Sequence, residues 1–158
     1  MHRIIFVIFA SLLMFSACDL RPTYDPNVVG ILAQVSVSPM EDRKGQIARS
    51  ALQRSLNPNL LNAEKRYELR ARVSTSTRVP LDVNSEFQTA VETLTIHGRL
   101  LDLDGSELWA GSSSRSSLYA KPQLPTLALD TQEDLWKDLA SLAASDITRQ
   151  LSVFLVEN

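Results

Sequence analysis

The stretch Tyr67-Glu68-Leu69-Arg70-Ala71-Arg72-Val73 decides the fold of this chain. Its apolar residues occupy alternate positions and its charged residues lie between them. A period of two is the pattern of a strand that is buried on one face only. We therefore expect an amphipathic β-strand that ends before Pro80, with one apolar face and one charged face.

Two further strands follow, and we expect them to pair through a hairpin. The apolar positions of Phe87 to Leu103 change parity along the segment, which indicates a β-bulge near Thr93. Asp104-Gly105 is typical of a type I′ turn. Glu107 to Tyr119 then returns as a strand, and its serine-rich middle has almost no apolar surface. We expect this middle part to protrude from the sheet or to pack against something polar.

The segments on either side supply one more strand and two helices. Val28 to Ser38 is rich in Val and Ile, and we expect a half-buried strand there. Glu41 to Leu56 has apolar residues at helical spacing, and Asn57-Pro58 stops the helix. Thr131 to Glu157 carries a longer apolar stripe and predicts a second helix.

These elements give the order β-α-β-β-β-α. We predict an α+β fold, a two-layer sandwich in which two helices pack on one face of a four-stranded mixed sheet. The first strand would join the sheet by a crossover through the first helix. Residues 28–158 are long enough for a single α/β domain with a core of its own.

The N-terminal segment predicts export and lipid attachment. Residues 1–17 have a short basic start, an apolar run and small residues at the end, which is typical of a secretory signal peptide. Cys18 follows directly and is the only cysteine in the chain, so it has no internal disulfide partner. The sequence Phe15-Ser16-Ala17-Cys18 resembles the lipobox of bacterial lipoproteins. Cys18 would carry an S-diacylglycerol and an N-acyl chain, and residues 18–27, with Pro22 and Pro26, would form a tether.

Charge is distributed unevenly, although the whole chain has a formal net charge of only −2. Nine basic residues and two acidic ones lie between Arg43 and Arg78. From Asp130 to the C-terminus the acidic residues are in excess. This pattern suggests a face that tolerates an anion, and it is equally consistent with two solvated faces.

Signs of catalysis are weak. His97 has no Cys or His partner, so we expect a surface histidine rather than a metal ligand. Gly111 to Arg115 lacks the second glycine of a nucleophile elbow. Asp102, Asp104 and Glu107 lie at the expected hairpin, where acidic residues commonly serve the turn. We expect no enzyme activity, no metal, no cofactor apart from the lipid on Cys18, and no nucleic-acid partner.

Several short motifs give the chain its resemblance to a known family. They are Cys18-Asp19-Leu20-Arg21-Pro22-Thr23-Tyr24, Asp42-Arg43 with Gly45-Gln46, Tyr67-Glu68-Leu69, Asp104-Gly105 before Leu108, and Tyr119-Ala120 before the final helix. In this order they resemble the LptE family of lipopolysaccharide-assembly lipoproteins. The resemblance covers nearly the whole chain after the signal peptide.

The resemblance implies a non-enzymatic function. Proteins of this family plug the LptD β-barrel of the outer membrane, assist its assembly and bind lipopolysaccharide. By this resemblance LptD and lipopolysaccharide are the expected partners, and the periplasmic face of the outer membrane is the expected location. The phosphates of lipid A are natural ligands for arginine. The candidate contact residues are Arg70, Arg72, Arg99 and Arg115, and a solvated sheet edge is the alternative explanation for each.

Two other readings of the chain stay open. Asp19 follows the lipidated cysteine and resembles the signal that retains lipoproteins in the inner membrane of enteric bacteria. The chain could then be an auxiliary lipoprotein of an ABC-type lipid transport system. A periplasmic hydrolase is a third class, but the chain after the signal offers only His97 as a histidine base.

Overall fold

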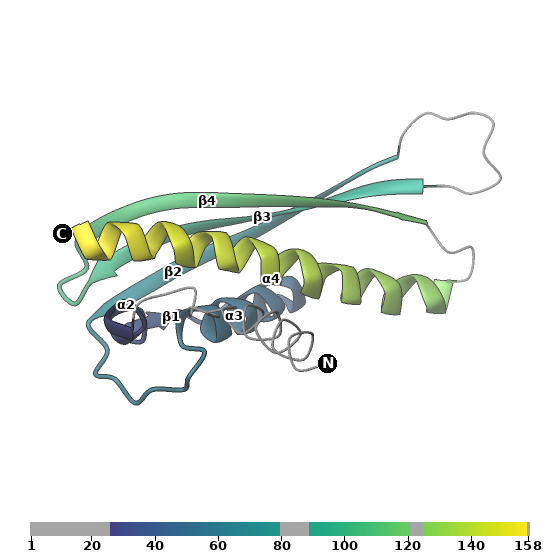
Figure 1. The fold of residues 1–158 in the computed structure, drawn as a ribbon. Coiled ribbons are helices and arrows are strands. Elements are labelled where there is room, and N and C mark those ends of the chain that lie inside the picture. Colours follow the sequence, from purple (N-terminus) through teal and green to yellow (C-terminus); the bar gives the residue numbers. More distant parts are fainter. Residues whose placement is uncertain (1–25, 80–88, 121–124, 158) are drawn as a thin grey trace, which may run out of the picture.

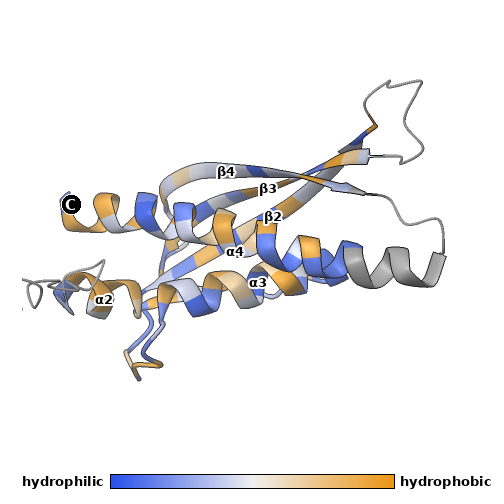
Figure 2. Ribbon diagram, turned by 45° about the vertical axis from the view of Figure 1, so that its right-hand side comes forward, coloured by the Kyte–Doolittle hydropathy of each residue, from blue (hydrophilic) through white to orange (hydrophobic). Residues whose placement is uncertain are grey.

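The sheet is mixed, and its strands lie in the order β1-β2-β3-β4. In the computed structural model β1 (Val35–Val37) runs parallel to β2 (Tyr67–Arg78). β3 (Thr89–Asp102) pairs antiparallel with both β2 and β4 (Glu107–Ala120). The predicted strand pattern at Tyr67 is confirmed, and hydrophobic and hydrophilic residues alternate along β2 (Figure 2). The structure describes residues 26–79, 89–120 and 125–157.

Three helices belong to the described part of the chain, namely α2 (Pro26–Leu32), α3 (Arg43–Leu56) and α4 (Pro125–Glu157). α3 and α4 pack side by side on one face of the sheet (Figure 1). The predicted α+β architecture is therefore confirmed, with three helices instead of two. β1 reaches β2 by the expected crossover through α3.

The core fills the space between the helices and the inner face of the sheet. α3 begins after Asp42, whose carboxylate oxygen accepts a hydrogen bond of 2.6 Å from the backbone N–H of Gly45. That bond satisfies one of the free donors at the helix start. The apolar side chains of α3, α4 and the strands then meet in one cluster, which includes Leu52, Leu69, Leu94, Ile96, Leu100, Ile147 and Leu151.

The expectation of a strand from Val28 to Ser38 is wrong over its first half. This half forms α2, and only Val35–Val37 is extended. Val28, Ile31 and Leu32 follow helical spacing as well as they follow alternation. Pro26 suits the first position of a helix, and α2 gains partners by packing against α4. The local pattern fitted both structures, and the tertiary contact selected the helix. The last two residues of the expected tether thus belong to α2.

The expected bulge near Thr93 is also wrong. β3 keeps one register through Thr93, and its irregularity lies between Leu100 and Leu101. The apparent change of parity arose because Glu92, a charged residue, occupies an inward position and is 1% exposed. Its carboxylate accepts hydrogen bonds from the Thr77 hydroxyl and, at 3.0 Å, from the Trp136 indole N–H. These donors make its burial tolerable.

The hairpin between β3 and β4 occurs where predicted but with a different turn. Gly105 has a φ of +88°, and no other residue of this turn has a positive φ. A type I′ turn needs two such residues, so this is a type I turn followed by a glycine bulge. The carboxylates of Asp102 and Asp104 accept hydrogen bonds from the backbone N–H groups of Leu103 and Ser106, at 2.7 and 2.9 Å. These two acidic residues therefore serve the turn, as expected.

The final helix starts earlier than predicted, because α4 begins at Pro125 and not at Thr131. Proline is well suited to a first helical position, since it has no N–H to leave unpaired. Gln132–Glu157 is long and apolar enough to cross a bilayer by composition. In this fold 44% of its most apolar window is buried, and its side chains Leu139, Ile147 and Leu151 belong to the core.

Candidate anion-binding face of the sheet

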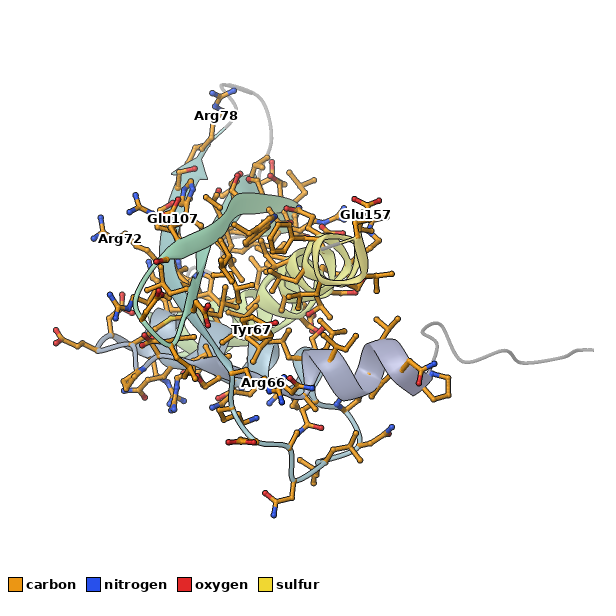
Figure 3. All side chains as sticks on the ribbon, turned by 90° about the vertical axis from the view of Figure 1, so that its left-hand side faces the viewer. Arg66, Tyr67, Arg72, Arg78, Glu107 and Glu157 are labelled. Carbon is orange, nitrogen blue, oxygen red and sulfur yellow. The ribbon has the colours of Figure 1, made fainter. Side chains whose placement is uncertain are left out.

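The outer face of the sheet, opposite the helices, carries a cluster of basic side chains. Arg70 and Arg72 of β2 lie directly opposite Arg99 and His97 of β3. All four side chains are exposed. Figure 3 shows Arg72 pointing away from the helices. We call these four residues the basic face.

The basic face borders a hollow in the sheet. A cavity of about 710 Å³ opens here, lined by the basic face together with Ser74, Ala110 and their neighbours Ala71, Gly98 and Gly111. Among the described residues, no helix or loop packs on this side of β2, β3 and β4. The cavity is therefore accessible to a ligand from outside.

Two of the three arginines have acidic neighbours. Arg70 donates two hydrogen bonds to one oxygen of Glu68, at 3.0 and 3.2 Å. The Ser38 hydroxyl also donates to Glu68, and this bond, followed by that from Arg70, lowers the pKa of the Glu68 carboxyl. Arg99 lies 3.7 Å from a carboxylate oxygen of Glu107. Both pairs are exposed, and exposed ion pairs contribute only about 0–1 kcal/mol.

The cross-strand arrangement brings like charges close together. Like charges directly opposite each other on an antiparallel pair are destabilising, and Arg70 faces Arg99 in this way. Arg72 has no hydrogen-bond or ion-pair partner among the described residues. An incoming phosphate could replace the weak carboxylate pairs and accept bidentate hydrogen bonds from arginine. The basic face is therefore suited to bind an anionic group.

Beyond the basic face the outer surface is a ladder of hydroxyl groups. Thr95 pairs with Ser114 and Thr93 with Ser116, and the hydroxyl oxygens of each pair lie 2.9 and 2.8 Å apart. Ser74 and Ser76 of β2 continue the same two rows. This side of the serine-rich strand is thus polar and exposed, and carries no apolar surface at its centre.

Arg115 does not belong to the basic face. It lies opposite Leu94, which is completely buried, so its side chain is on the side of the helices. Its Nε donates to the Asp146 carboxylate of α4 at 2.7 Å, and the Ser113 hydroxyl donates to the same oxygen at 2.8 Å. The prediction that the serine-rich segment packs against something polar is confirmed at this point. The structure brings Arg70, Arg72 and Arg99 together and separates Arg115 from them.

Asp146 is held in its charged form by this arrangement. Burial by itself would raise the pKa of the carboxyl. The hydrogen bonds from Ser113 and Arg115, together with the charges of Arg115 and Arg149, outweigh burial and lower the pKa. Arg115 thus has a structural partner on α4.

His97 was expected to be a surface histidine, and it is exposed. Its position beside Arg72 could not be predicted from local pattern, because Arg72 belongs to another strand. Within the described ranges no group of three His, Cys, Asp or Glu side chains could hold a metal ion. Cys18 lies outside the described residues.

No protein-family model and no curated protein matches the sequence. Solved structures do resemble it. A chain from Caulobacter crescentus, described provisionally as a lipoprotein, aligns with a TM-score of 0.69 and 22% identity, over 84% of this chain and 98% of that chain. A minor lipoprotein from Acinetobacter baumannii aligns with a TM-score of 0.59 and 18% identity, over 78% of this chain and 94% of that chain. The chain shares their fold.

Proposed function

We propose that this protein is a non-enzymatic lipoprotein of the bacterial cell envelope, anchored through lipid on Cys18. The signal-like segment and the lipobox-like sequence before Cys18 support the anchor. The two proteins that share the fold are themselves described as lipoproteins, one of them provisionally. The anchor would hold the folded domain at the membrane surface.

We further propose that the domain is a subunit of a lipopolysaccharide translocon, as its resemblance to LptE implies. The observation that carries this proposal is the basic face, which is open to solvent and borders a cavity of about 710 Å³. The phosphates of lipid A would bind Arg70, Arg72 and Arg99 in place of the present weak ion pairs. Arg115 is not part of this binding site, since it is paired with Asp146 on the other side of the sheet.

The hydroxyl ladder supports the choice of an LptD-type barrel as the partner. The lumen of a large outer-membrane barrel is polar and hydrated. A surface of Ser and Thr side chains can exchange hydrogen bonds with such a wall without a large desolvation cost. The domain would occupy the lumen and face the passing lipopolysaccharide.

The binding proposal is tested by charge reversal on the purified acylated protein. Arg70→Glu, Arg72→Glu and Arg99→Glu together should weaken lipopolysaccharide binding at least about tenfold, since that factor requires only about 1.4 kcal/mol. Arg72→Glu and Arg54→Glu form a matched pair, because each reverses one exposed arginine that has no hydrogen-bond or ion-pair partner in the described part of the chain. Only the first should weaken binding. Equal binding by the triple variant and the unaltered protein would exclude the basic face.

The partner is tested by purification from membranes in mild detergent. Recovery of an outer-membrane β-barrel in equal amount, with the protein in the outer-membrane fraction, is the expected result. Recovery of an ABC transporter component from the inner membrane would instead favour the auxiliary-lipoprotein function, and Asp19 would then act as a retention signal.

A further inference from the structure

Exposed apolar side chains gather at one end of the molecule. Tyr67, the first residue of β2, pairs with Val35 and with Asp102. The loop 57–66 and the hairpin turn 103–106 therefore leave the sheet at the same end. α4 also ends here, because its later residue Gln150 bonds the carbonyl of Ser112 near the start of β4. We call this the hairpin end (Figure 1).

Most of the exposed large apolar side chains lie at the hairpin end. Of the nine large apolar residues that are exposed in the described part of the chain, six lie at the hairpin end. They are Leu60, Leu61, Leu103, Leu108, Val153 and Val156. Clustered exposed apolar groups of this kind mark a contact surface more often than single scattered ones do.

The loop 57–66 holds its leucines outward by a defined structure. The Asn57 side chain accepts a hydrogen bond from the N–H of Leu61 at 2.8 Å and donates one to the Leu61 carbonyl at 2.9 Å. Leu60 has a φ of +51° and is 87% exposed. A positive φ is unfavourable for a leucine, so the loop presents this side chain to water at the cost of backbone strain. Figure 2 shows the apolar tip of this loop.

The hairpin turn presents Leu103 in a similar way. Leu103 is 78% exposed, and the turn around it is fixed by the Asp102 and Asp104 carboxylates. The hydrogen bond that the Asp104 carboxylate accepts from the Ser106 N–H is the largest cause of the lowered pKa of Asp104. Both loops are therefore built to hold an apolar side chain away from the fold.

The short stretch of chain between Cys18 and the domain indicates that these side chains lie near a bilayer. Only seven residues separate Cys18 from Pro26, the first residue of α2. A fully extended chain of that length spans at most about 28 Å. α2 joins β1 at the hairpin end, so a lipid on Cys18 would hold this end close to the bilayer (Figure 1).

The charges at this end are mixed. Lys65 and Arg66 are the last two residues of the loop 57–66. Glu64 of the same loop and Asp104 of the hairpin turn are acidic. A charged surface alone would not hold this end on an anionic membrane. The contact must come mainly from apolar insertion, with the basic residues at the level of the lipid phosphates.

We propose that, before the domain enters a barrel lumen, the hairpin end rests on the membrane surface and Leu60, Leu61 and Leu103 insert into the lipid interface. This inference rests on the proposed lipidation of Cys18. The strands would then rise away from the bilayer. Arg70 is three residues beyond Tyr67, which places the basic face roughly 10 Å from this end.

The test places an environment-sensitive fluorophore on the acylated protein in vesicles of phosphatidylethanolamine and phosphatidylglycerol. Leu60→Cys and Leu103→Cys supply the labelling sites, because acylation consumes the only native thiol. Leu118→Cys is the matched control, since Leu118 is 62% exposed at the far end of β4 and pairs with Val91. Both hairpin-end probes should shift to the blue and lose most of their fluorescence to lipid-borne quenchers, and the control should do neither.

The outcomes separate this inference from the proposed anchor, because intact mass measures acylation independently. An acylated protein whose Leu60 and Leu103 probes resemble the control would refute the membrane contact and retain the anchor. A blue shift without quenching by lipid would also refute it, and would indicate a protein contact such as a second copy. An unacylated chain whose probes are quenched would refute the anchor and retain the contact.

Discussion

Gly111→Ala is the substitution that best tests the packing around Gly111 of β4, which lies beside Trp109 of the same strand and Gln150 of α4. A Cβ at Gly111 would lie far inside contact distance of Trp109 Cζ2 and 2.7 Å from the Gln150 side-chain oxygen. Carbon atoms normally approach to about 3.5–4.0 Å, so the indole would have to withdraw by more than about 1 Å. Such overpacking typically costs about 1–3 kcal/mol, and alanine recovers about 0.5–1 kcal/mol of chain entropy. We expect a net loss of about 1–2 kcal/mol.

The contact with Trp109 can be isolated by a double-mutant cycle. In the background of Trp109→Ala, Gly111→Ala should be neutral or stabilising, because the indole atoms are gone and only the end of the flexible Gln150 side chain has to move aside. Gly98→Ala is the matched control on the neighbouring strand. Its Cβ would lie 3.3 Å from Leu69 Cδ1 and Trp109 Cζ3, so a shift of a few tenths of an ångström accommodates it. We expect its net effect to be within about 0.5 kcal/mol of zero.

Urea unfolding followed by far-ultraviolet circular dichroism measures these differences. A loss of 1 kcal/mol should also lower the Tm by roughly 3–5 °C for a domain of this size. If Gly111→Ala cost the same free energy with and without the Trp109 indole, the indole would not be what requires a glycine here, and the packing argument would fail.

Three other predictions concern stability and are measured by the same unfolding experiments. Asp146→Asn should make stability less dependent on pH in acid. The pKa of Asp146 is lower in the folded than in the unfolded protein, so the charged carboxylate stabilises the fold above the unfolded-state pKa of about 4. This stabilisation is lost as the pH falls through the folded-state pKa. An unchanged acid limb would contradict the pairing with Arg115. Glu92→Ala should cost about 1–3 kcal/mol by leaving the Trp136 indole N–H without its acceptor, and Glu92→Gln should cost less; equal losses would contradict this. Gly30→Ala should stabilise α2 by about 0.5–1 kcal/mol, since its Cβ meets nothing within 4 Å, and a loss would show that the site is more crowded.

The four candidate arginines show what a local sequence pattern can predict and what it cannot. Alternation around Leu69 placed Arg70 and Arg72 on one face of β2 correctly, because the parity of a strand is a local property. It could not place Arg115 relative to them. The register of β3 on β4 decides that Arg115 lies opposite the buried Leu94, and that register is set by contacts between strands.

The sequence alone determined the helix that ends at Leu56, the strand at Tyr67 and the position of the hairpin, because periodicity and turn residues act over a few neighbours. It also carries the case for lipid attachment at Cys18, which rests on a linear motif. Only the tertiary structure decided that α2 is a helix, that Glu92 is buried, and that Arg70 faces Arg99. Each of these depends on residues distant in the chain, whose packing and hydrogen bonds outweigh the small free-energy differences between local conformations.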